Sequence, residues 1–134
     1  MLTVGMFEEF VEKNKCEKFP VIVRLYDVTG NLQCLPVDDI YNPISEWKKL
    51  SGFRLSAFED VKKTETLTVK GMIDSFEGAG RFHDESWPLL TNLQPIVKPD
   101  YHSRRTFHVL SIELGKHKFK GGRKEHSVLI LSLT

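Results

Sequence analysis

The strongest constraint on the fold is a pair of strand-like runs joined by a short basic connection. The runs are TFHVLSIEL, residues 106–114, and HSVLILSLT, residues 126–134, and both are rich in aliphatic and β-branched residues. The connection between them, KHKFKGGRKEH at residues 116–126, contains a Gly-Gly pair that can turn the chain with positive φ. Two such runs with a glycine-bearing link predict a β-hairpin, and so favour antiparallel sheet.

The remaining segments supply strands and helices in an order typical of an α+β domain. TVGMFEEFVEKNKC, with Thr3 as its cap, predicts an N-terminal helix because its apolar residues recur at helical spacing. DDIYNPISEWKKLSG, residues 38–52, predicts a second helix that begins at Asp38 or Asp39 and buries Ile40, Ile44 and Trp47. Strands are predicted at residues 19–27, 32–37, 53–58 and 66–76, besides the two closing runs.

Two further features refine this prediction. Pro36 confines the strand at residues 32–37 to a sheet edge, because proline lacks the N–H that a central strand donates. Residues 77–103 form a long connection, rich in glycine and proline, with one helical turn at SWPLL. We therefore expect a single domain over residues 1–134: a twisted antiparallel sheet of about six short strands, an N-terminal helix and a second helix after the first hairpin.

The composition is that of a globular chain with its own core. At 134 residues and 15.4 kDa the fold can bury roughly two-thirds of the surface of the unfolded chain. No apolar run reaches the roughly 20 residues of a membrane-spanning helix, and the first residues lack the pattern of a signal peptide, which predicts an intracellular protein at synthesis. Cys16 and Cys34 are too few for a disulfide framework and are expected to be small, half-buried residues.

No catalytic or metal-binding motif stands out. The five histidines, His83, His102, His108, His117 and His126, show none of the spacings typical of metal ligands. HDE, residues 83–85, joins an imidazole to two carboxylates but has no second group to work with, so we interpret it as a solvated loop. We expect a protein that is not an enzyme and has no metal, cofactor or small-molecule substrate.

The charge is nearly balanced overall but is unevenly distributed. Residues 1–60 hold 7 Lys/Arg against 10 Asp/Glu, residues 61–98 hold 5 against 5, and residues 99–134 hold 7 against 3. A basic C-terminal third predicts an anionic partner at that pole, such as nucleic acid or a membrane surface. The alternative is that the lysines only keep the tip of the hairpin soluble. The residues expected to bind the anionic partner are Arg104, Arg105, Lys116, Lys118, Phe119, Lys120, Arg123 and Lys124, with Phe119 as an exposed aromatic ring.

The N-terminal helix offers a second candidate surface. Its apolar face contains Phe7 and Phe10, with Met6 beside them. This face either packs on the protein's own sheet, which we favour, or meets a second copy in a homo-oligomer.

Several segments, taken in order, resemble the matrix proteins of vesiculovirus-type rhabdoviruses. FPVIVRLYDVTGNLQCLPVDDIYNPISEW is similar to their first strand, turn, strand and Trp-containing helix, and LSAF to the strand that follows. AGRFHDESWPLL resembles the start of their long proline-bearing loop, and HSRRTFHVLSIEL resembles the paired-arginine strand before the C-terminal sheet. Each match covers a few residues, and together they extend from about Phe19 to Leu114.

This resemblance implies a structural protein of the virion and host cytoplasm, peripheral at the membrane. Such a protein self-associates, binds the viral nucleocapsid or RNA, and bridges it to the anionic inner face of a membrane. The chain departs from the family in having neither a lysine-rich N-terminal tail nor a Pro-Pro-x-Tyr or Pro-[Ser/Thr]-Ala-Pro motif. The alternative is a small β-rich, OB-like protein that binds single-stranded nucleic acid, favoured by TLTVKGMIDSF read as a strand and by aromatic residues near cations.

Overall fold

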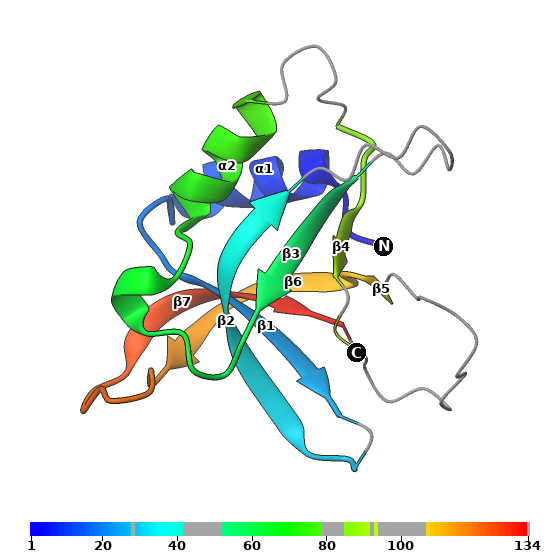
Figure 1. Ribbon diagram of the computed structural model, residues 1–134. Helices are drawn as coiled ribbons and strands as arrows, with labels where there is room; N and C mark the ends of the chain where they lie inside the picture. Colours follow the sequence, from blue (N-terminus) through cyan, green and yellow to red (C-terminus); the bar gives the residue numbers. More distant parts are fainter. Residues whose placement is uncertain (28, 42–51, 79–84, 92, 94–106, 134) are drawn as a thin grey trace.

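The computed structural model describes residues 1–27, 29–41, 52–78, 85–91, 93 and 107–133, which form an α+β fold with an N-terminal helix, as expected (Figure 1). The described elements are α1 (Val4–Asn14), β1 (Val21–Tyr26), β2 (Leu32–Tyr41), β3 (Phe53–Ala57), the short 3-10 helix η1 (Lys63–Glu65), α2 (Val69–Gly78), β4 (Leu89–Thr91), β5 (Phe107–His108), β6 (Ser111–His117) and β7 (His126–Ser132).

The sheet has seven strands in the order β5-β4-β3-β2-β1-β7-β6. It is mixed, because β1 pairs with β7 and β3 pairs with β4 in parallel, while the other neighbours are antiparallel. The expected antiparallel sheet of about six strands is therefore corrected. A parallel neighbour needs a crossover connection, and α2 supplies it between β3 and β4.

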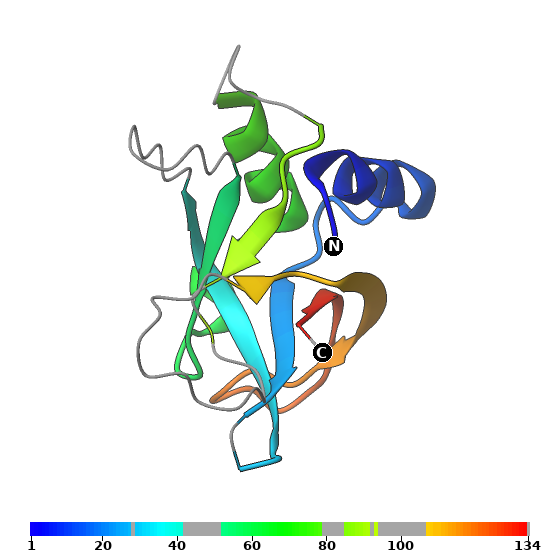
Figure 2. The same ribbon diagram turned by 90° about the vertical axis from the view of Figure 1, so that its right-hand side faces the viewer.

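The two edge strands of the sheet are almost consecutive in the chain. β5 and β6 are separated only by Val109 and Leu110. The N–H of Val109 donates to the carbonyl of Leu89 at 2.9 Å, and the N–H of Leu110 donates to the carbonyl of Ser132 at 2.8 Å. Because one short segment reaches both edges, the sheet curls into a half-barrel (Figure 2).

The two helices cover one face of this curled sheet and complete the main core (Figure 1). The Thr3 hydroxyl caps α1 by accepting the N–H of Met6 at 3.2 Å. Phe76 on α2 lies 4.8 Å from Phe53 on β3 and 5.6 Å from Phe7 on α1, measured between ring centroids. The side chains that each helix buries are Val4, Phe7 and Val11 from α1, and Val69, Met72 and Phe76 from α2.

The strand predicted at residues 66–76 is wrong, because this segment forms α2. Its buried residues Val69, Met72 and Phe76 are spaced three and four apart, which is the period of a helix. The Thr68 hydroxyl accepts the N–H of Gly71 at 3.2 Å and so satisfies one of the first amides of the helix. The strand-like alternation at residues 66–71 depends on treating Gly71 as an apolar residue. It is also too short to distinguish the two-residue period of a strand from the period of a helix.

The helix predicted at residues 38–52 does not begin at Asp38 or Asp39, because both belong to β2 with Ile40 and Tyr41. Residues 42–51, including Ile44 and Trp47, lie outside the described residues. The strand predicted at residues 32–37 is therefore longer than expected.

Pro36 lies in a central strand rather than at an edge. β2 has β1 on one side and β3 on the other. The carbonyl of Pro36 accepts the N–H of Phe58 at 3.2 Å, one residue after the end of β3. The backbone N and O of a strand residue point to the same side of the strand. The nitrogen of Pro36 therefore faces the β3 side, where the hydrogen bonds between β2 and β3 end. The sheet therefore loses no regular hydrogen bond at this position.

The helical turn predicted at SWPLL is also corrected, because Leu89–Thr91 forms β4. Leu89 and Leu90 are both buried, one on each face of the sheet. A short strand buried on both faces has no alternation for a sequence pattern to detect. The strands predicted at residues 19–27 and 53–58 are confirmed as β1 and β3.

Candidate anion-binding surface

The hairpin predicted between the closing runs is confirmed for β6 and β7, and its connection folds back onto the sheet. The first run, residues 106–114, is however not one strand as predicted, because it is divided between β5 and β6 at the two edges of the sheet. β6 and β7 pair antiparallel from Ser111 opposite Ser132 to His117 opposite His126. Gly121 has a φ of 79°, and the N–H of Gly122 donates to the carbonyl of Phe119 at 2.9 Å. This tight turn keeps residues 118–125 close to the sheet.

Phe119 is buried, with only 3% of its surface exposed, which corrects the expected exposed ring. It packs with Ile22, Val128, Ile130 and Cys34. Ile22 alternates along β1 with the core residues Val21 and Val23, so this cluster lies on the sheet face away from the helices. Phe119 is buried because that face of the sheet is apolar and neither helix covers it.

Two histidines, which are cross-strand partners, contact the ring of Phe119. The ring centroid of His117 lies 4.8 Å from that of Phe119, edge-on, and that of His126 lies 6.0 Å away. Burial lowers the pKa of both imidazoles, and the positive charges of Lys63 and Lys124 lower the pKa of His126 further. Lys63 and Lys124 therefore lie near His126, although Lys63 belongs to a different connection.

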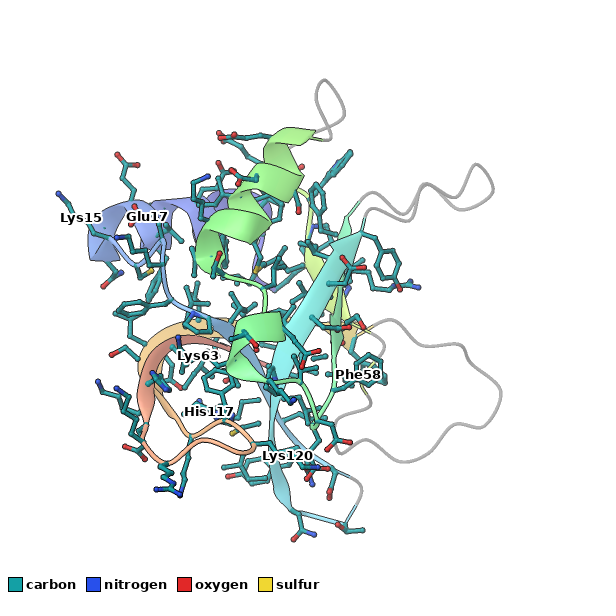
Figure 3. The ribbon with its side chains drawn as sticks, turned by 60° about the vertical axis from the view of Figure 1, so that its left-hand side comes forward. Lys15, Glu17, Phe58, Lys63, His117 and Lys120 are labelled. Atoms are coloured by element: carbon teal, nitrogen blue, oxygen red, sulfur yellow. The ribbon has the colours of Figure 1, made fainter. Side chains whose placement is uncertain are left out.

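This second connection, residues 58–68 between β3 and α2, runs beside the β6–β7 connection (Figure 3). Lys120 forms an ion pair with Asp60, which raises the pKa of Lys120 through their hydrogen bond and the negative charge of the carboxylate. Within the part of the chain that the structure describes, no ion pair involves Lys63, Lys118, Arg123 or Lys124. We call these four cations, Lys63 on the second connection and Lys118, Arg123 and Lys124 on the β6–β7 connection, the basic surface.

The predicted anion-binding residues thus divide into several groups. Lys118, Arg123 and Lys124 are exposed on the basic surface, as expected. Lys120 is exposed but paired with Asp60, and Lys116 donates to the Ser127 hydroxyl at 2.8 Å. Arg104 and Arg105 lie outside the described residues.

Lys63 and Phe58 are the residues that the sequence reasoning missed. Phe58 is 59% exposed at the start of the second connection (Figure 3). The only sequence signal was the Lys-Lys pair at residues 62–63, and nothing local places that pair beside a hairpin far along the chain.

The apolar face of α1 packs on the protein's own core, as favoured. Phe7 is fully buried, so it has no surface to offer a second copy, which corrects its assignment to self-association. Phe10 is partly buried against the core, while Met6 is 52% exposed.

The opposite pole of the molecule is acidic. A groove of about 540 Å³ beside α1 is lined by Glu8, Glu9, Glu12 and Glu85, with smaller polar and apolar residues between them. α1 and the β6–β7 connection lie at different ends of the molecule (Figures 1 and 2). The glutamates of this groove therefore lie away from the basic surface.

The described residues contain no group of three or more His, Cys, Asp or Glu side chains that could hold a metal ion. Of the HDE segment, His83 and Asp84 lie outside them, and Glu85 is exposed. No helix among the described elements is long and apolar enough to cross a membrane.

Comparisons with models of protein families, with curated proteins and with solved structures each found no match. The resemblance to rhabdovirus matrix proteins therefore remains a prediction.

Proposed function

We propose that this protein is a matrix-type viral structural protein, not an enzyme, that self-associates and bridges ribonucleoprotein to an anionic membrane surface. The observation that carries the proposal is the basic surface: four cations without ion pairs among the described residues. Three of them lie on the β6–β7 connection, which the buried Phe119 fixes to the sheet, and Lys63 lies on the connection beside it. Such a cluster of like charges is stabilised by an anionic partner.

The polarity of the molecule supports binding in one orientation. The basic surface would face the anionic partner, while the glutamates beside α1 would be repelled to the far side. With Phe119 in the core, contact with a membrane would be electrostatic at the headgroups and would need no inserted ring. We therefore expect binding to weaken steeply as salt is added.

The test is co-sedimentation with phosphatidylcholine vesicles, with and without phosphatidylserine, at low and high salt. The variant reverses Lys118, Arg123 and Lys124 to Glu and leaves Lys120 in place, because Lys120 holds Asp60. Each basic residue near an anionic surface contributes about 1 kcal/mol, so the three substitutions should weaken binding by at least about 100-fold.

A matched control reverses Lys13, Lys15 and Lys18 to Glu, which changes the net charge equally in the last turn of α1 and just after it. Figure 3 labels Lys15. It should retain most of the binding. Equal losses in the two variants would show that net charge, and not the basic surface, drives binding. If the wild-type protein binds neither phosphatidylserine vesicles nor nucleocapsids, the proposal is wrong.

The alternative, an OB-like protein that binds single-stranded nucleic acid, has lost two of its supports. TLTVKGMIDSF is largely helix and Phe119 is buried, although the exposed Phe58 lies on the same connection as Lys63. Fluorescence anisotropy with a short single-stranded oligonucleotide tests it. Tight binding to the naked strand, lost on Phe58→Ala and accompanied by no vesicle binding, would favour the alternative.

A further inference from the structure

β6 forms one edge of the sheet and is much the longer of the two edge strands. It has seven residues, whereas β5 at the other edge has two. An edge strand presents a row of N–H and C=O groups that can pair with another strand.

The hydrogen bonds of β7 identify which residues of β6 face outward. The N–H groups of Leu129 and Leu133 donate to carbonyls of Pro20 and Arg24, so the odd-numbered residues of β7 point to β1. The even-numbered residues therefore point to β6, where their partners are Ser111, Glu113 and Gly115. The residues of β6 between these partners point their backbone groups away from the sheet: Ile112, Leu114 and Lys116.

Among the described residues, no backbone hydrogen bond covers these outward groups. Two leucine side chains at this edge are also exposed: Leu110, just before β6, at 51%, and Leu114, within it, at 40%. Strand edges that stay solvated are commonly short, charged or interrupted by proline. β6 has a single lysine among its outward-facing residues, and leucines at its middle and just before its start.

We propose that β6 pairs with β6 of a second copy of this chain, antiparallel about a two-fold axis at Leu114, so that the two sheets become continuous. The inference deepens the self-association in the proposed function and rests on it. The surface that contacts a second copy is then the open edge of the sheet at β6, and not the face of α1 that contains the buried Phe7.

The register follows from the outward groups. With Leu114 opposite Leu114 of the second copy, Ile112 faces Lys116, and all three outward residues of each strand fall in hydrogen-bonded pairs. On the other face, Glu113 lies opposite Gly115 and Ser111 opposite His117. No like charges lie directly opposite each other, whereas a register shifted by two residues could bring Glu113 opposite Glu113. The strand is therefore complementary to itself.

The first test is Leu114→Pro, measured by analytical ultracentrifugation over a range of concentrations. The N–H of Leu114 has no partner within the described monomer, and an outward-facing edge position tolerates proline. We expect an unchanged far-UV circular dichroism spectrum and dimerisation weakened by at least about tenfold, because both copies lose a central hydrogen bond.

A pair of glutamate variants controls for the loss of an exposed leucine. Leu114→Glu should prevent dimerisation by placing two carboxylates at the two-fold axis. Leu32→Glu changes a leucine on β2 that is 52% exposed, against 40% for Leu114. Because β1 and β7 separate β2 from β6, this variant should leave dimerisation intact. A wild-type protein that stays monomeric at all concentrations, or a folded Leu114→Pro that dimerises like wild type, overturns the inference.

Cross-linking tests the register independently. In a Cys34→Ala background, Leu114→Cys should form a disulfide-linked dimer under mild oxidation, because hydrogen-bonded antiparallel partners have Cα atoms about 5.5 Å apart. Lys116→Cys should not, since two such residues would lie about 13 Å apart along the strands. Cross-linking of Lys116→Cys alone would rule out this register.

Vesicle binding by the monomeric variants distinguishes the two proposals. If a variant no longer dimerises but still binds phosphatidylserine vesicles, the proposed binding to an anionic surface does not depend on this dimer.

Discussion

At the residue scale, Phe119 determines how the basic connection is presented. Exposed like charges on a flexible link would spread apart, because each pair repels by a few tenths of a kcal/mol. Burial of the ring among Ile22, Val128 and Ile130 offsets this repulsion and holds the cations on a defined surface. One apolar side chain between lysines thus converts a soluble turn into a fixed arrangement of charges.

Replacing Phe119 with alanine should lower the free energy of unfolding by about 3 kcal/mol, the usual cost of removing a buried phenylalanine. Urea denaturation measures the change. Phe58→Ala is the matched control. Because the residue is 59% exposed, the substitution should change the free energy of unfolding by less than about 0.5 kcal/mol. Similar losses in the two variants would mean that Phe119 contributes no more to stability than a surface ring.

At the scale of elements, the β1–β2 hairpin is organised by one carboxylate. Asp27 accepts the N–H groups of Thr29 and Asn31 at 2.9 and 3.0 Å, and its second oxygen accepts the side-chain amide of Gln33 at 2.8 Å. The hydrogen bonds from Thr29 and Gln33 lower the pKa of Asp27 to about 2.

The lowered pKa gives the hairpin a defined dependence on pH. A carboxylate with a depressed pKa stabilises the folded state fully above its unfolded pKa of 3.8, and this contribution disappears as the pH falls through about 2. Wild type should therefore be more stable than Asp27→Ala at neutral pH, and the difference should shrink between about pH 4 and pH 2. Thermal unfolding of both proteins across this range checks it, and a difference that stays constant down to pH 2 would contradict it.

Local periodicity explains which elements the sequence could predict. α1 and β1 each have a clear period and a cap or turn at one end, and both were predicted. α2 was missed because Leu67, Val69 and Gly71 imitate a strand before the helical period emerges at Met72 and Phe76. Similarly, Pro36 predicted an edge strand because a central strand normally needs the missing N–H. The sequence does not reveal that β3 ends beside Pro36, so that no N–H is needed there.

The candidate site was only partly predictable for the same reason. Lys118, Arg123 and Lys124 lie in one short run, so their clustering is local. The burial of Phe119 depends on an apolar sheet face built from β1, β2 and β7, and the position of Lys63 depends on how two connections pack. These long-range contacts leave no signature in a single sequence.

At the scale of the whole molecule, the two apolar clusters share their strands. β1 contributes Val21 and Val23 to the helix side and Ile22 to the Phe119 side. β7 likewise alternates Leu129 with Val128. Neither cluster can lose these strands without exposing the other, which predicts a single cooperative unfolding transition.

Two probes on opposite faces test this cooperativity. Trp87 packs against Phe53, with ring centroids 5.8 Å apart, and its fluorescence in a Trp47→Phe variant reports the helix side. The NMR signals of His117 and His126 report the ring of Phe119. Their urea midpoints should coincide, and a separate, earlier midpoint for the histidines would show that the basic connection unfolds on its own.

The parallel pairing of β1 with β7 also constrains the order in which the fold can be completed. β7 lies between β1 and β6, yet β1 is made early and β7 late in the described sequence. During synthesis, the edge of β1 that pairs with β7 has no partner strand until residues 126–132 have left the ribosome. Contacts between such distant parts of a chain form slowly, because a long loop must close before they are gained. The nascent chain therefore presents an apolar strand edge for most of its synthesis, which is when it is most exposed to mispairing and most in need of a chaperone.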